Sequence, residues 1–325
     1  MVAPPEASTR SGVEIVSHLY YTFCMIKKAK RYFNTSGPNI PAEHYTLRRE
    51  KLIERGIELV EKKRYFTIWA PRQTGKSTYF LMLSKKLETL GYRVLHTNVE
   101  NFKSATEESF LTVLGNEFRR GIDLNLDAKS FHLFHDQLME VRDRKMVLII
   151  DEVEGLNPDI FGQFLHTIRN LYHFRDNHGL KSVILVGVSN IVGVVQDSAS
   201  PFNIADNLEV PYFTNEETGE LLHMHEKETG QLFHEKVKEK IPSITGNQPG
   251  LVNGFAYQLV ERHPDKEVID YDDYLAVEDW YINIAVDKNI SNIINKAKDY
   301  RKFVEGLLFS ENPVKFTIND ERIKF

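Results

Sequence analysis

The sequence predicts an α/β protein in three layers, with a parallel central sheet between helices, followed by a small helical lid. Three observations predict this fold. A short apolar stretch runs through a glycine-containing loop into a helix over residues 65–78. A continuous apolar run at 146–150 is typical of a strand buried on both faces of a parallel sheet. Apolar strands and amphipathic helices alternate between these two stretches and beyond them.

The composition is typical of a globular protein and excludes several classes of protein. The chain has 325 residues, of which 42% are hydrophobic and 27% charged, a length and balance typical of about two globular domains. The net charge of −5 gives no global basic field for nonspecific nucleic-acid binding. A single cysteine, Cys24, excludes an intrachain disulfide framework and a cysteine-based metal site, and favours a reducing, cytoplasmic location. No apolar run approaches the ~20 residues that span a bilayer, so no membrane association is expected.

Residues 1–32 are expected to be disordered or to lie outside the fold. Met25 begins a stretch typical of a natural start, so residues 1–24 are interpreted as an upstream extension. An amphipathic helix is then expected over 50–60. Just before it, Tyr45 is a candidate either for stacking on adenine or for an ordinary core position.

The loop that follows the first strand carries the first chemical motif. Gly75 allows a tight turn, and the backbone N–H groups of such a loop cradle phosphate at the helix N-terminus. Lys76 would reach the β- and γ-phosphates, and the Ser77 hydroxyl would complete a Mg²⁺ shell. The alternative without a binding role is an ordinary strand–turn–helix corner with a surface lysine. The candidate phosphate-binding residues are Ala70, Pro71, Arg72, Gln73, Thr74, Gly75, Lys76, Ser77 and Thr78.

The elements after the loop follow in alternation. Gly91 is expected to end the helix that starts at Lys76. Strands are expected at 93–99, 146–150, 182–189 and 208–210, and helices at 76–90, 106–120, 130–142 and 158–174.

The acidic pair Asp151–Glu152 is the second motif, directly after the apolar run. Ligands of open parallel sheets bind beyond the carboxyl ends of the strands, where the loop and this pair would meet. Asp151 would hold Mg²⁺, and Glu152 would orient and deprotonate the attacking water. Ser189 and Asn190 end the next strand, where they would contact the γ-phosphate or the water, or simply cap the strand.

The C-terminal part is predicted to be mostly helical. Helices are expected at 215–229, 232–241, 251–262 and 289–309, with a turn at 246–250 and a strand at 314–318. Its histidines lack the spacing of a zinc-binding motif, so they are interpreted as surface or core residues.

The motifs at 70–77 and 147–152 resemble those of the AAA+ and STAND branch of P-loop NTPases, and more narrowly the bacterial AAA-like domain ATP-binding proteins. Less specific similarities at 33–45, 200–217 and 245–252 extend the resemblance over about residues 30–310. Ala70 stands where the strict loop pattern has glycine. The resemblance implies a P-loop NTPase core at 33–212, a helical lid at 213–268 with Pro249 near the adenine, and a partial winged-helix-like segment at 269–325.

The resemblance also implies ATP and Mg²⁺ as cofactors, and an arginine finger from a neighbouring subunit of a homo-oligomer or from a protein partner. Arg169 and Arg175 are candidates, and a solvated helix face is the alternative for both. No sensor arginine is evident, since Arg262 lies far from Pro249.

Together the two motifs predict a Mg²⁺-dependent P-loop ATPase that acts as a nucleotide-driven conformational switch. One alternative is a signalling or scaffold module that binds ATP with little turnover, for which Glu152 would be unnecessary. Another is a DNA-handling ATPase of mobile-element or defence systems, supported only by the basic cluster Lys296, Lys298, Arg301 and Lys302. Whether nucleic acid is a partner is therefore left open at this point.

Overall fold

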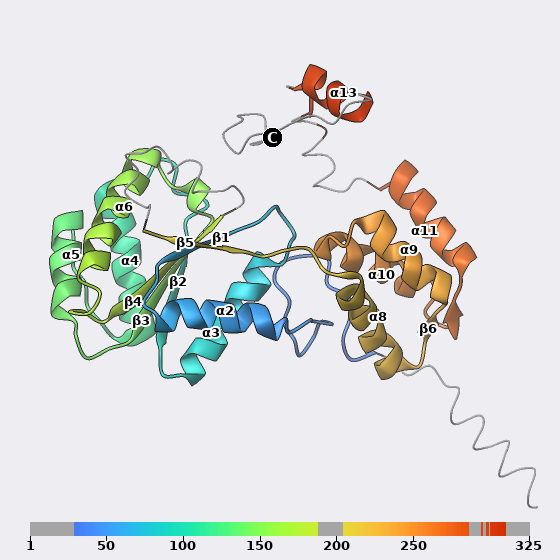
Figure 1. The fold of residues 1–325 in the computed structure, drawn as a ribbon, viewed down its shortest axis with the longest axis horizontal. Helices are drawn as coiled ribbons and strands as arrows, with labels where there is room; N and C mark the ends of the chain where they lie inside the picture. The colour runs from blue at the N-terminus through green and yellow to red at the C-terminus, as the bar shows by residue number, and fades with distance from the viewer. Residues whose placement is uncertain (1–28, 188–203, 286–293, 295–296, 299, 310–325) are drawn as a thin grey trace, which may run out of the picture. The chain divides into compact units, whose positions relative to one another are not determined.

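A computed structural model of the chain describes residues 29–187, 204–285, 294, 297–298 and 300–309 (Figure 1). The chain divides into two compact units. We call Arg48–Pro211 the sheet unit, and residues 29–47 with Tyr212–Ala285 the helical unit. No helix within the described ranges is long and apolar enough to cross a membrane.

The sheet unit is built on five parallel strands in the order β2-β3-β4-β1-β5 (Figure 1). Every strand therefore ends at the same edge of the sheet. The non-sequential order means that β1 lies between β4 and β5. The strands are β1 Phe66–Trp69, β2 Arg93–Asn98, β3 Met146–Asp151, β4 Leu180–Gly187 and β5 Asp206–Glu209.

Alternate side chains of β3 point to opposite faces of the sheet, as the period of a strand requires. Leu148 and Ile150 pack among the helices of one face, and Val147 and Ile149 among those of the other. Both faces are covered, which confirms the predicted three-layer α/β fold with a parallel sheet. One face carries α4 Glu107–Ile122, α5 Phe131–Glu140 and α6 Pro158–His173, and the other α2 Glu50–Glu61 and α3 Lys76–Thr89.

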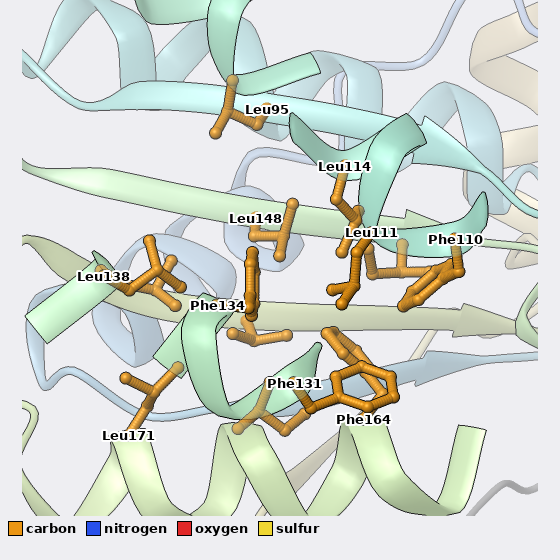
Figure 2. Close-up of a cluster of buried hydrophobic side chains, with 14 of the residues drawn as sticks. Leu95, Phe110, Leu111, Leu114, Phe131, Phe134, Leu138, Leu148, Phe164 and Leu171 are labelled. Carbon is orange, nitrogen blue, oxygen red and sulfur yellow. The ribbon is translucent and has the colours of Figure 1, made fainter. Parts of the chain in front are cut away.

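Aromatic rings fill the space between the sheet and the helices α4, α5 and α6 (Figure 2). Phe164 is fully buried, and its ring meets Phe110 edge-on at 5.4 Å between centroids. Phe118 and Phe134 make a similar contact at 6.2 Å. Such edge-to-face pairs add to the stabilisation from apolar burial. This core holds the strand that ends in the acidic pair.

The helical unit has its own core, to which the segment 29–47 contributes Phe33, Tyr45 and Leu47. These side chains pack against apolar residues of four helices and a two-stranded sheet. The elements are α8 Asn215–Thr229, β6 Leu232–Phe233, α9 Glu235–Thr245, α10 Pro249–Arg262, β7 Val268–Ile269 and α11 Tyr271–Asn283.

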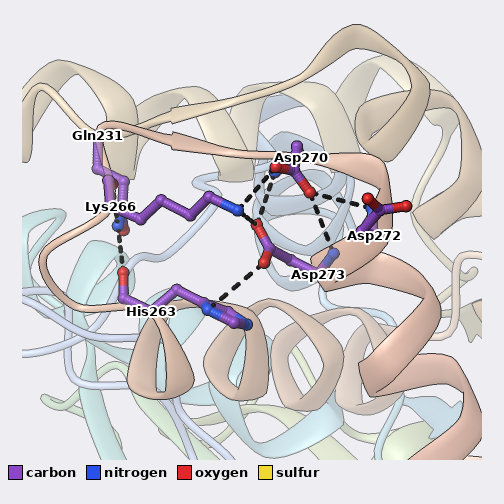
Figure 3. Close-up of polar contacts among 6 residues, drawn as sticks. All are labelled: Gln231, His263, Lys266, Asp270, Asp272 and Asp273. Carbon is purple, nitrogen blue, oxygen red and sulfur yellow. Dashed lines mark hydrogen bonds and ion pairs between the residues drawn. The ribbon is translucent and has the colours of Figure 1, made fainter.

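Polar contacts fix the connection from α10 to α11 (Figure 3). The Lys266 ammonium donates to Asp270 at 2.7 Å and to Asp273 at 2.6 Å. Asp270 also accepts from the first backbone N–H groups of α11 as its N-cap. The hydrogen bond from Lys266, followed by that from the Asp273 backbone, lowers the pKa of Asp270 to about 2. Gln231 donates to the carbonyls of His263 and Lys266, which joins β6 to the same connection.

The compact units divide the chain differently from the predicted domains. Residues 33–47 group with the helical unit, and α11 shares its core through Tyr274 and Val277. The domain bounds at 33–212, 213–268 and 269–325 stay predictions. The helix predicted at 232–241 is wrong at its start.

Residues Leu232–Phe233 form β6 because they pair with β7, and α9 begins only at Glu235. Pro249 already starts α10, where its missing N–H costs nothing, so the predicted turn is shorter. Of the helix expected at 289–309 the structure describes α13 Arg301–Phe309. The strand expected at 314–318 lies outside the described residues.

Candidate nucleotide-binding site

The loop between β1 and α3 has the backbone geometry that its sequence predicts. Gly75 is the N-cap of α3 with φ 89°, a conformation that glycine adopts without strain. Gln73 also has a positive φ, of 59°. The hydroxyl of buried Thr74 donates to the Pro71 carbonyl at 3.0 Å and closes the loop on itself. The chain thus turns sharply and presents the N-terminus of a 14-residue helix.

Lys76 lies inside this loop. Its side chain is only 8% exposed, and the ammonium donates to the carbonyls of Ala70 at 2.7 Å and Pro71 at 2.8 Å. Burial lowers its pKa, while the carboxylates of Glu152, Glu154 and Asp151 oppose that shift. The loop lysine and the acidic segment after β3 therefore lie close enough to interact electrostatically, as the sequence predicted. A surface lysine on an ordinary corner is excluded by this burial.

Asp151 is the last residue of β3 and is 6% exposed. One carboxylate oxygen accepts the backbone N–H of Glu152 at 2.9 Å. The other lies 3.7 Å from Nε2 of His96, on the neighbouring strand β2. The backbone therefore fixes one carboxylate oxygen of Asp151, and the second oxygen can accept a hydrogen bond or bind a cation.

Glu152 has a left-handed backbone, with φ 56° and ψ 45°, which is uncommon for a residue with a side chain. Burial, followed by repulsion from Glu154 and Asp151, raises the pKa of its carboxyl to about 7, although Lys76 opposes the shift. The turn that follows packs closely against the backbone of Glu100: a Cβ on Gly155 would lie 2.4 Å from it, so only glycine fits there. The carboxyl of Glu152 is therefore held on a backbone conformation that costs free energy for a residue with a side chain.

The residues present fit a magnesium nucleotide. Mg²⁺ prefers oxygen ligands and is held by few protein groups together with phosphate oxygens. Ser77, half-buried in the first turn of α3, offers a hydroxyl, and Asp151 offers a carboxylate. Among the described residues no three His, Cys, Asp or Glu side chains form a group that could hold a metal alone. A metal here would take its remaining oxygens from water or from a bound phosphate, which the loop is shaped to receive.

Two other predicted nucleotide contacts lie in the helical unit. Tyr45 has no exposed surface: its ring packs on Phe33 at 4.8 Å, and its hydroxyl hydrogen-bonds His225 at 3.2 Å. This burial supports the alternative of a core tyrosine, because a ring with no free face cannot stack on adenine. Pro249 is buried at the start of α10. Ser189 and Asn190 lie outside the described residues.

The arginine candidates make local contacts. Arg175 stacks on the ring of Tyr172 at 4.4 Å and donates to the Tyr172 carbonyl at 3.1 Å, just beyond the C-terminus of α6. Arg262 stacks on Trp280 at 4.6 Å. Arg169 is partly exposed on α6. A finger role for Arg169 or Arg175 stays a prediction, and Arg262 is not a candidate for it.

Sequence reasoning missed His96. Its ring packs against Phe80 of α3 at 4.8 Å, while its Nε2 faces Asp151. It therefore bridges the helix that follows the loop and the acidic pair. The available signal was its position near the end of an expected strand, two residues before Asn98, whose register partner is Asp151.

Comparison with known proteins agrees with this geometry. Residues 60–195 match the family model described as the AAA domain, and these residues include both motifs. No curated protein matches the sequence. Because the matched segment is less than half of the chain, the AAA domain is identified for that segment, while the narrower STAND branch and a bacterial origin stay predictions.

Three solved structures are similar to this chain. A Walker-type ATPase of Pyrococcus abyssi has a TM-score of 0.59 at 16% identity, covering 85% of this chain and 82% of its own. Cdc6p from Pyrobaculum aerophilum has 0.54 at 17%, covering 79% and 72%. The RuvB Holliday junction branch migration motor of Thermotoga maritima has 0.51 at 13%, covering 78% and 76%. At such identities the likeness establishes the fold alone.

Proposed function

We propose that this chain is a Mg²⁺-dependent P-loop ATPase that works as a nucleotide-driven conformational switch. The observation that carries the proposal is the meeting of two motifs at one sheet edge. Lys76 follows β1 and Asp151–Glu152 ends β3, and the buried ammonium interacts with both carboxylates. The match of residues 60–195 to the AAA domain supports the choice of ATP.

Each residue has a role that its surroundings support. The loop N–H groups and Lys76 bind phosphate oxygens, and Ser77 and Asp151 provide metal ligands. A bound Mg²⁺ nucleotide would supply the phosphoryl group and a cation that neutralises its charge. Glu152 accepts the proton of the attacking water, and a pKa of about 7 is well matched to a base that works near neutral pH.

The switch part of the proposal rests on the division into two units. Residues on both sides of the sheet unit in the sequence join one helical unit, so the chain enters and leaves the sheet unit through the connections near 47–48 and 211–212. Nucleotide-dependent rearrangement at such connections is a common way to couple hydrolysis to motion. An arginine from a second subunit or a partner would complete the charge stabilisation, as expected from the resemblance.

Hydrolysis of ATP by the full chain tests the proposal. Glu152→Gln should abolish phosphate release while ATP still binds, because the amide cannot accept the proton. Glu154→Gln is the matched control: it keeps the base and should retain turnover, with the pH profile moved to lower pH because Glu154 helps to raise the pKa of Glu152. If wild-type protein binds ATP but releases no phosphate at any pH, the result would favour the alternative of a signalling or scaffold module that binds ATP without turning it over. Equal turnover in wild type and Glu152→Gln would refute the assigned base.

A further inference from the structure

Positive charge is concentrated where four strands of the sheet begin. The connectors into β1, β2, β3 and β4, residues 62–65, 90–93, 141–145 and 174–181, contain nine Lys or Arg and two Asp. Their net charge is +7 (9 − 2), in a chain whose total is −5. We call these four connectors the basic edge. In a parallel sheet the strand starts share one edge, opposite the edge at which the nucleotide loop lies.

The basic groups of the edge are brought together across strands. The backbone N–H of Arg93 donates to the Lys145 carbonyl at 2.7 Å, so the starts of β2 and β3 are adjacent. Burial lowers the pKa of Lys181 in β4, and repulsion from Lys63 and Lys145 lowers it further. The groups thus form a row that follows the strand order: Arg93, Lys145, Lys181 and then Lys63.

Part of this charge has a structural use. Lys63 pairs with Asp176, and Arg64 pairs with Asp206 at 2.5 Å. Basic groups near helix C-termini are also favoured by the helix dipole, and α2, α5 and α6 end at this edge. These uses account for some of the basic residues but not for Arg93, Arg142 and Lys145, which are exposed.

Exposed Lys62 pairs with Glu58 at 3.6 Å, but three other exposed members make no ion pair with any residue that the structure describes. Arg93 and Arg142 are exposed, and neither makes an ion pair with any residue that the structure describes. Lys145 is exposed and stands over the ring of Tyr92 at 5.7 Å. Phe174, in the connector before β4, leaves 50% of its surface to solvent. The edge therefore offers free cations beside accessible aromatic surface.

From this arrangement we propose that the basic edge binds the phosphate backbone of single-stranded nucleic acid. Adjacent strands lie about 4.8 Å apart, so four neighbouring strand starts space their charges over about 14 Å. A row of that kind matches a linear polyanion, which can follow it, better than a compact anion, which would contact one or two groups. Exposed aromatic surface beside the row gives unstacked bases a place to stack. The inference does not depend on the ATPase assignment.

Fluorescence anisotropy with a labelled oligo(dT) of about 20 nucleotides tests the proposal on the full chain. The test variant carries Arg93→Glu, Arg142→Glu and Lys145→Glu. The matched control carries Lys85→Glu, Lys103→Glu and Arg119→Glu, three exposed residues of the sheet unit outside the basic edge that change the total charge equally. We expect the test variant to bind at least about tenfold more weakly at about 50 mM salt, and its salt slope to fall by about 2, while the control stays near wild type.

Thermal melting is measured on both triple variants to show that they fold. If the test variant does not fold, Arg142→Glu alone, on an exposed connector, should still weaken binding and lower the salt slope by about 0.7, the value for one lost phosphate contact. No binding of wild type at low salt would overturn the proposal, and so would equal losses in both triple variants. Binding of polyglutamate or of acidic phospholipid vesicles without binding of the oligonucleotide would also overturn it.

Discussion

A buried histidine should make the helical unit sensitive to acid. His225 is 2% exposed, and burial lowers its pKa, an effect that its hydrogen bond to Gln231 and the charges of Glu226 and Glu228 oppose. The amide nitrogen of Gln231 donates to two carbonyls, so its oxygen faces His225 and accepts from Nε2 at 2.9 Å. We assign Nδ1 as the acceptor for the hydroxyl of Tyr45. Protonation at Nδ1 would then remove this acceptor, and the hydroxyl of Tyr45 would have to turn its hydrogen away and accept instead.

The sign and size of the effect follow from linkage. Below pH about 6.5 the histidine of the unfolded chain binds a proton that the folded chain resists, so stability falls with falling pH until the lowered folded pKa is reached. The loss is up to about 1.4 kcal/mol per pH unit for one such histidine. Tyr45→Phe removes the competing donor, which should make this slope shallower.

Urea unfolding between pH 8 and pH 5 measures the slope. The chain has two tryptophans, so a Trp69→Phe background leaves Trp280 as a fluorescent reporter of the helical unit. The quantity that isolates His225 is the difference between this background and the same protein with His225→Gln. Identical pH slopes in the two proteins would refute the reasoning, because the lost protonation would then come from other groups.

Two further substitutions test the packing around the site. Phe164→Ala should lower the free energy of unfolding of the sheet unit by about 3–5 kcal/mol in urea titrations, because it empties a fully buried aromatic position; a loss below 1 kcal/mol would contradict the packing in Figure 2. Gly155→Ala should displace the turn after Glu152 and reduce ATP turnover, since its Cβ would lie 2.4 Å from the Glu100 backbone. Gly162→Ala, with nothing within 4 Å of the new Cβ, is its control and should leave turnover unchanged.

Local patterns predicted most of the sheet unit. The apolar run before Asp151 is typical of a doubly buried strand, and the turn at Gly75 follows from a residue without a Cβ. Both predictions rest on residues that lie within the predicted strand or turn itself, so no distant partner is needed to make them. The phosphate loop and the acidic pair were found for the same reason, and the order of strands then brings them to one edge.

Features that depend on distant partners could not be predicted in this way. The place of Tyr45 is set by His225, which is 180 residues away. The two-residue strands β6 and β7 exist only because they pair with each other, so Leu232 was assigned to a helix. The approach of His96 to Asp151 depends on the pairing of β2 with β3, and its only trace in the sequence is the place of His96 near the end of an expected strand. The left-handed backbone of Glu152 leaves no pattern in the sequence.

The affinity for Mg²⁺-ATP tests the central claim, that the loop and the acidic pair form one nucleotide site. Lys76→Ala removes a buried ammonium from the loop, and loss of a charge-assisted contact worth about 1.5–3 kcal/mol should weaken binding about 10- to 150-fold in calorimetric titration. Lys85→Ala, an exposed lysine on the same helix, should bind as wild type does. Wild-type affinity in Lys76→Ala, or no binding by the wild-type protein, would contradict the account.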